Sequence, residues 1–207
     1  MTKIKICGIT NKEDAIWVAN LGADYFGMIF ARVSKRKISL EKAKEISEAV
    51  PPYIKKVGLF ADEEPKTVNK VLEICKLDVL QFHGEETPEY CHEFKGKAEI
   101  IKGFRMKDEE SIARIPQYDV DYYLLDAFVE GEIGGTGQTF NWDLALKVKE
   151  LGRPIFLAGG LNPDNVGEAI KKVRPFAVDV ASGVESSPRK KNIELMREFI
   201  NKVRKVG

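Results

Sequence analysis

The feature that most constrains the fold of this chain is a regular alternation of short apolar, β-branched runs with amphipathic segments along its whole length. Eight of the apolar runs are predicted to be strands, at residues 4–7, 25–30, 55–60, 79–82, 99–104, 122–126, 154–158 and 177–180. Short runs that are apolar almost throughout are typical of strands in a parallel sheet with both faces buried. The alternation therefore predicts an α/β protein.

The segments between these strands are predicted to be helices. Some carry apolar residues at helical spacing, as at positions 68, 71, 72 and 75 and again at 166, 169, 170 and 173. Three helix starts are predicted, at a capping box of Thr10 and Glu13, at Thr87-Pro88 and at Asn162-Pro163.

Eight strand–helix units without a Ser/Gly-rich linker favour a single-domain (β/α)8 TIM barrel over residues 1–207. The length of 207 residues suits one such domain. A doubly wound open sheet is the alternative, although it seldom needs so regular a repeat. Both folds place the active site at the carboxyl ends of the strands, so the residues there are the candidates for function.

Composition limits the partners and the compartment. A hydrophobic content of 43% and a charged content of 31% describe a soluble globular protein, and a net charge of +1 gives no reason to expect nucleic acid or a membrane as partner. The three cysteines are widely spaced and suggest neither a zinc site nor a disulfide framework. With no signal-like or membrane-spanning segment, we expect a reduced, cytoplasmic protein.

A thiol and a carboxylate stand at the ends of two predicted strands. Cys7 ends the first strand and is followed by a Gly turn, where it is either a small buried hydrophobe or a functional thiol. Asp126 ends the sixth strand and precedes a Gly-rich stretch at residues 131–137. This stretch is predicted to be a loop that can move over a pocket, with Asp126 as a general acid at its root.

Glycines and cations follow other strands. Gly159-Gly160 and Ser182-Gly183 follow the seventh and eighth strands, where barrels commonly bind phosphate through backbone N–H groups. Arg36 lies in a basic loop, of which one cation is predicted to bind a substrate carboxylate, although the sequence does not decide which. His83, after the fourth strand, either bonds substrate or packs at the barrel mouth.

Seven motifs in this order resemble the phosphoribosylanthranilate isomerase family over nearly the full length. They are Lys5-Ile6-Cys7-Gly8-Ile9-Thr10, Ser34-Lys35-Arg36, Gln81-Phe82-His83-Gly84, Leu124-Leu125-Asp126, Gly134-Gly135-Thr136-Gly137, Leu157-Ala158-Gly159-Gly160-Leu161-Asn162 and Val178-Asp179-Val180-Ala181-Ser182-Gly183-Val184-Glu185. The resemblance implies a TIM barrel that performs an Amadori rearrangement of a small phosphorylated substrate, N-(5-phosphoribosyl)anthranilate, with no cofactor and no metal.

The resemblance also implies roles for individual residues. Cys7 is expected to be the general base that removes the C2′ proton, and Asp126 the general acid that protonates the ribose ring oxygen. Arg36 is expected to hold the anthranilate carboxylate. His83 and Asp179 match family positions that line the substrate site, and Gly159, Gly160, Ser182 and Gly183 are expected to bind the phosphate.

Three alternatives compete with this interpretation. A related histidine-pathway sugar isomerase has an aspartate where this chain has Cys7 and uses two phosphate sites. A Schiff-base aldolase needs a lysine inside the barrel, for which Lys102 is the candidate, although we expect it to be a snorkelling or loop lysine. A non-catalytic phosphate-binding barrel needs no acid and thiol on opposite strands. The chain is expected to be a monomer or a homodimer.

Overall fold

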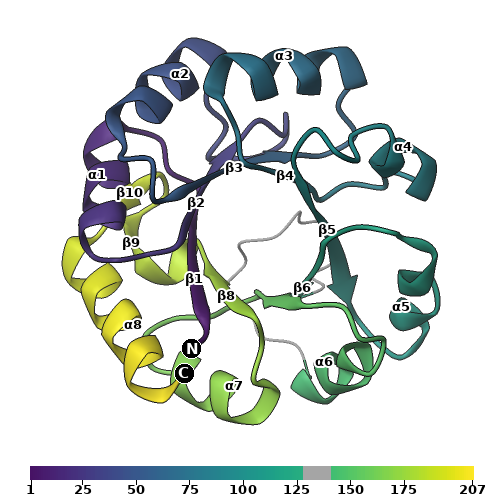
Figure 1. The fold of residues 1–207 in the computed structure, drawn as a ribbon. Helices are drawn as coiled ribbons and strands as arrows, with labels where there is room; N and C mark the ends of the chain where they lie inside the picture. The colour runs from purple at the N-terminus through teal and green to yellow at the C-terminus, as the bar shows by residue number, and fades with distance from the viewer. Residues whose placement is uncertain (128–140) are drawn as a thin grey trace.

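The computed structural model describes residues 1–127 and 141–207. Eight parallel strands close into a barrel in chain order, and helices surround it (Figure 1). The barrel strands are β1 (Lys3–Cys7), β2 (Tyr25–Ile29), β3 (Lys55–Phe60), β4 (Val79–Phe82), β5 (Glu99–Met106), β6 (Tyr122–Ala127), β7 (Ile155–Leu157) and β8 (Ala177–Val180). All eight predicted strands are confirmed, with ends that differ by no more than two residues.

The helices lie between the strands and on the outside of the barrel (Figure 1). In the described residues they are α1 (Lys12–Asn20), α2 (Leu40–Ala49), α3 (Pro65–Cys75), α4 (Pro88–His92), α5 (Glu110–Ala113), α6 (Trp142–Lys149), α7 (Val166–Val173) and α8 (Ile193–Val206), with 3-10 turns η1 (Ile115–Gln117) and η2 (Ser182–Val184). None of the helices in this part of the chain has the length and apolar composition needed to cross a membrane.

The pairing of β1 with β8 closes the barrel and rules out the open-sheet alternative. Ile4 lies opposite Val178 and Lys5 lies opposite Asp179 in a parallel register. The two chain ends therefore lie side by side in Figure 1. Since a closed barrel has no free sheet edge, every strand delivers its carboxyl end to the same mouth.

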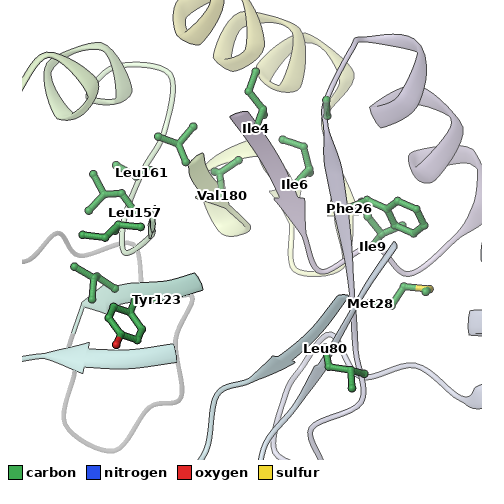
Figure 2. Packing of buried hydrophobic residues seen from close by; sticks show 14 of the residues in the cluster. Ile4, Ile6, Ile9, Phe26, Met28, Leu80, Tyr123, Leu157, Leu161 and Val180 are labelled. Carbon is green, nitrogen blue, oxygen red and sulfur yellow. The ribbon is translucent and has the colours of Figure 1, made fainter. Parts of the chain in front are cut away.

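Alternation along the strands divides the apolar side chains between two cores. Ile4 and Ile6 point outward into the larger core between sheet and helices, together with Phe26, Met28 and Leu80 (Figure 2). Each such side chain contributes roughly 1.5–3 kcal/mol relative to an exposed one. A smaller core fills the interior of the barrel and consists of Tyr25, Val57, Val79, Ile101, Leu124, Phe156, Ala158 and Ala177. The interior of the barrel is thus packed with side chains.

Two of the three predicted helix starts are wrong in position. Thr87 caps α4 as predicted, since its hydroxyl accepts from Tyr90 N at 3.3 Å. The cap of α1 is Asn11, whose side chain accepts from Asp14 N at 2.7 Å, whereas Thr10 donates to the carbonyl of Arg189. Two neighbouring residues that can both cap are not distinguished by local pattern, because the choice depends on this long-range bond.

The third predicted start falls in a turn. The Asn162 side chain accepts from Asp164 N at 2.8 Å and from Asn165 N at 3.2 Å, and α7 begins only at Val166. Asn162-Pro163 therefore forms a turn that precedes the helix, as Asn side chains commonly do.

A short hairpin after β8 was not predicted. Strands β9 (Glu185–Ser187) and β10 (Lys190–Lys191) pair in antiparallel fashion directly after η2. The hairpin is fastened to the start of α1, because Asp14 accepts from Lys191 N at 3.2 Å and Thr10 donates to Arg189 O at 2.9 Å. It thereby brings two charged residues, Glu185 and Lys191, to the barrel mouth.

The cap of α1 gives a first testable prediction. Replacing Asn11→Ala removes the acceptor of Asp14 N and is expected to lower the free energy of unfolding by about 0.5–2 kcal/mol. Glu13 is exposed, so Glu13→Ala is the matched control and is expected to change stability by less than about 0.5 kcal/mol. Urea unfolding measures the free energy of unfolding of both variants. A larger loss for Glu13→Ala than for Asn11→Ala would favour the capping box of Thr10 and Glu13 instead.

Candidate active site

A cavity of about 690 Å³ opens at the carboxyl ends of the barrel strands. The predicted site residues that line it are Cys7, Arg36, His83, Asp126, Asp179 and Ser182. The structure thus brings together side chains from β1, β6, β8 and three loops. Gly159, Gly160 and Gly183 do not line this cavity.

The carboxylate of Asp126 is paired with a histidine. Its Oδ2 lies 3.2 Å from Nε2 of His83, and its Oδ1 accepts from Ala127 N at 2.9 Å. His83 is therefore in contact with the candidate acid and lines the cavity, and its role toward substrate stays a prediction. Gln81, which sequence reasoning missed, places its Nε2 3.1 Å from Nδ1 of His83. When Gln81 donates to Nδ1, the ring proton sits on Nε2 and faces the carboxylate.

Cys7 lies at the end of β1 beside a buried ion pair. The thiol residue is only 4% exposed, and burial raises its pKa. Lys5, two residues earlier on the same strand, is fully buried and its Nζ lies 3.0 Å from Oδ1 of Asp179. The positive charge of Lys5 lowers the pKa of Cys7 and so opposes the effect of burial.

Lys5 is the main functional candidate that sequence reasoning missed. Strand residues alternate between faces, so Lys5 must share the inward face of Cys7, while Ile4 and Ile6 point outward. The signal was therefore present as a lysine two positions before the candidate base. It was overlooked because an isolated lysine near a chain terminus is normally exposed.

Arg36 is already held by a protein carboxylate. Its Nε and Nη2 donate to the two oxygens of Glu185 at 2.8 and 2.7 Å, a bidentate pair that raises the pKa of Arg36. Lys191 also donates to Glu185, at 3.0 Å. Another cation of the basic loop, Arg32, instead bonds Glu63 with a side chain that is 77% exposed. Of these two arginines, only Arg36 lines the cavity, as Lys35 of the same loop also does.

The turns after β7 and β8 lie against each other. Gly159 and Gly160 adopt φ values of 80° and 61°, in the left-handed region that favours glycine. At Gly183 a Cβ would lie 2.0 Å from the carbonyl oxygen of Leu161, so only glycine allows this approach. Ser182 begins the short η2 turn and reaches the cavity. The predicted phosphate residues are thus neighbours, although their binding role stays a prediction.

The expectation that Lys102 is a snorkelling or loop lysine is wrong. It is neither a snorkelling lysine nor inside the barrel, because it points to the outer face of β5 and is 2% exposed. Its Nζ donates to Glu86 at 2.8 Å and to Gly84 O at 2.7 Å. Glu86 in turn accepts from Gly84 N at 2.9 Å. The ion pair therefore fixes the loop that carries His83, and Lys102 has no access to the cavity.

The remaining expectations concern the Gly-rich loop, a metal site and the cysteines. The Gly-rich stretch at residues 131–137, predicted to be a loop over the pocket, lies outside the described residues. Within the described ranges, no group of three or more His, Cys, Asp or Glu side chains is placed to hold a metal ion. All three cysteines are free and buried.

Comparisons with known proteins identify the family of this chain. A family model described as N-(5'phosphoribosyl)anthranilate (PRA) isomerase matches residues 4–202. The chain belongs to the N-(5'-phosphoribosyl)anthranilate isomerase family. The isomerase of Geobacter sp. (strain M21) is 47% identical over 207 residues and covers 100% of both chains. The family resemblance inferred from the motifs is therefore confirmed.

Solved structures of the isomerase family have the same fold. The isomerase of Thermotoga maritima is 42% identical in sequence, and its structure superposes with a TM-score of 0.94. The superposition covers 99% of this chain and 100% of that one. A phosphoribosylanthranilate isomerase in complex with reduced 1-(o-carboxyphenylamino)-1-deoxyribulose 5-phosphate is 40% identical, with a TM-score of 0.90 and the same coverage. The TIM barrel is therefore the fold of the family as well as of this chain.

The buried pair of Lys102 and Glu86 gives the second prediction. Replacing Lys102→Met leaves the Glu86 carboxylate buried without its cation and is expected to cost roughly 3–5 kcal/mol of unfolding free energy in urea. Adding Glu86→Gln removes the orphaned charge and is expected to recover part of that loss. A double variant as unstable as Lys102→Met would show that the charge pairing is not the cause.

Proposed function

We propose that this chain catalyses the Amadori rearrangement of N-(5'-phosphoribosyl)anthranilate to 1-(2-carboxyphenylamino)-1-deoxyribulose 5-phosphate in tryptophan biosynthesis. Family membership supports the reaction. The observation that carries the residue roles is the single cavity that holds a thiol, Cys7, and a carboxyl group, Asp126, on strands β1 and β6. These strands are separated around the barrel, so an acid and a base can act on different atoms of one bound sugar.

The first step is the opening of the ribose ring. Asp126 delivers a proton to the ring oxygen, the bond between C1′ and that oxygen breaks, and the nitrogen lone pair forms an iminium. His83 contacts the same carboxyl group at 3.2 Å and so orients the acid at the cavity. General acid catalysis of this kind contributes about 10²–10⁴-fold to rate.

The second step is removal of the C2′ proton. The iminium makes this proton acidic, and the Cys7 thiolate takes it while the C–H electrons form a C1′–C2′ double bond and neutralise the nitrogen. The enolamine then tautomerises to the ketone, with the proton of the 2′ hydroxyl lost and one gained at C1′. Atoms and electrons balance within the substrate, so the overall reaction is an isomerisation.

Binding is assigned to two regions of the cavity and to the pair of glycine turns beside it. Arg36 recognises the anthranilate carboxylate through Nη1, which has no hydrogen bond within the part of the chain that the structure describes, while Glu185 anchors the rest of the guanidinium. Asp179 and His83 contact the sugar. The backbone N–H groups of the turns after β7 and β8 hold the phosphate; their residues are Gly159, Gly160, Ser182 and Gly183.

The proposed base also bears on compartment and assembly. A catalytic thiol must remain reduced, which suits a cytoplasmic enzyme. A related isomerase from Thermotoga maritima is described as dimeric, and this chain is proposed to be a monomer or a homodimer. Light scattering in solution distinguishes these two states.

The third prediction tests the acid and the base. Cys7→Ala and Asp126→Asn are each expected to lower kcat by roughly 10²–10⁴-fold, because each removes one proton-transfer group. The affinity for the reduced product analogue should change little, since neither group anchors the ligand ends. Cys91→Ala, a buried cysteine on α4 away from the cavity, is the matched control. Wild-type turnover in both site variants would refute the assigned roles.

The fourth prediction concerns the carboxylate anchor. Arg36→Ala is expected to raise KM for phosphoribosylanthranilate by about tenfold or more, because a charge-assisted hydrogen bond is worth roughly 1.5–3 kcal/mol. Lys35→Ala is the matched control, since Lys35 also lines the cavity but bonds no protein carboxylate in the described residues. Steady-state kinetics decides between them. An unchanged KM for Arg36→Ala with a raised one for Lys35→Ala would transfer the role to Lys35.

A further inference from the structure

Lys5 is a fully buried lysine that points into the barrel interior. Its side chain is fully buried, directly beneath the cavity and above the apolar interior core. Burying an ammonium group requires compensation, here supplied by Asp179 at 3.0 Å. Apolar side chains of similar volume usually fill such a space at equal or better stability. The position of this ion pair therefore calls for a role other than packing.

The ammonium of Lys5 and the thiol of Cys7 border the same small gap. Gly27 of β2 lies opposite Cys7 in the parallel register. A Cβ at Gly27 would lie 2.8 Å from Sγ of Cys7 and 3.3 Å from Nζ of Lys5. Because β2 carries no side chain at this position, the thiol and the ammonium both lie close to the same point beside Gly27.

Within residues 1–127 and 141–207, the charges that act on Cys7 come from four segments. They are Lys5 on its own strand, Asp179 on β8, Lys191 on β10 and Arg36 on the loop after β2. Lys191 and Arg36 both bond Glu185, which offsets their charge at the thiol. Asp126 and His83 act electrostatically on Asp179, and neither is among the main influences on the pKa of Cys7. Lys5 is thus the cation with the greatest influence on the thiol.

The protonation of Lys5 is secured by its neighbours. Burial alone lowers the pKa of Lys5, but Asp179 and Cys7 outweigh burial and the pKa lies above its ordinary value. Lys5 is therefore favoured in its charged form beside Cys7. This is the arrangement expected of a fixed positive charge beside a thiol that must ionise.

We propose that the Lys5 ammonium, held in place by Asp179, stabilises the Cys7 thiolate and is a positioning residue for the base of this isomerase. The proposal rests on the assignment of Cys7 as the base in the proposed function. Asp179 then has two opposite effects, because it anchors Lys5 but its own negative charge disfavours the thiolate. Gly27 keeps the space between Sγ and Nζ open.

The fifth prediction follows from these opposite charges. Lys5→Met is expected to move the pH midpoint of Cys7 ionisation upward by about one unit or more, so that the thiolate fraction below the midpoint falls at least about tenfold. Asp179→Asn is expected to move the midpoint downward, since it removes the anion. General loosening of the barrel would expose the thiol in both variants and move both midpoints in the same direction.

The measurement is the rate of alkylation of Cys7 by iodoacetamide as a function of pH. Peptide mass spectrometry separates Cys7 from Cys75 and Cys91. Lys102→Met is the matched control, because it also removes a buried, ion-paired lysine but on the outer face of the sheet, and it is expected to leave the Cys7 midpoint unchanged. The acidic limb of the kcat profile should shift with the alkylation midpoint in each Lys5 and Asp179 variant.

A further variant keeps the test decisive if Lys5→Met alone does not fold. Combining Lys5→Met with Asp179→Asn removes both buried charges, and the midpoint should still exceed that of the wild type, because Lys5 outweighs Asp179 at the thiol. Wild-type midpoints in every folded variant that lacks Lys5 would overturn the proposal. Failure of the proposed function is separate, since it would appear as undiminished turnover in Cys7→Ala.

Discussion

The hydrogen bonding of β1 to β8 is the constraint on which the remainder of the molecule depends. It joins residues at opposite ends of the chain and sets the register in which Lys5 lies beside Asp179. Without this closure, the inward face of β1 would border solvent and a buried lysine would have no partner. With it, the two strands form one wall of a packed interior, and Cys7 is placed directly above an ion pair of 3.0 Å.

The sequence predicted the strands and the catalytic face because both follow from local pattern. Eight repeats of a short apolar run followed by a helical segment leave few alternatives to a closed barrel. In such a barrel, the positions of Cys7 and Asp126 in the sequence place both residues at the ends of strands. Their partners were not predictable in the same way. Arg36 meets Glu185 across 149 positions, and the hairpin that carries Glu185 and Lys191 has no apolar pattern of its own. Contacts of this kind depend on closure, which local pattern does not encode.

The acid and the base occupy environments of opposite character. Asp126 is beside the imidazole of His83, whereas the thiol of Cys7 is buried beside the ammonium of Lys5. Two titratable groups whose surroundings differ in this way can hold different protonation states at one pH, which is the requirement for acid–base catalysis across a single substrate. The two environments differ because their charged neighbours come from different parts of the barrel. Lys5, beside Cys7, belongs to β1, and His83, beside Asp126, belongs to the loop after β4.

Two buried lysines support these two halves of the site from opposite faces of one sheet. Lys102 points outward from β5, and its partner Glu86 holds Gly84 N, the residue directly after His83. Lys5 points inward from β1 and faces the thiol. The two lysines point to opposite faces only because side chains alternate along a strand. A shift of either lysine by one position would place it on the other face. The Lys102 pair can therefore orient the histidine beside the acid only through the backbone, whereas Lys5 acts on the thiol directly through its charge.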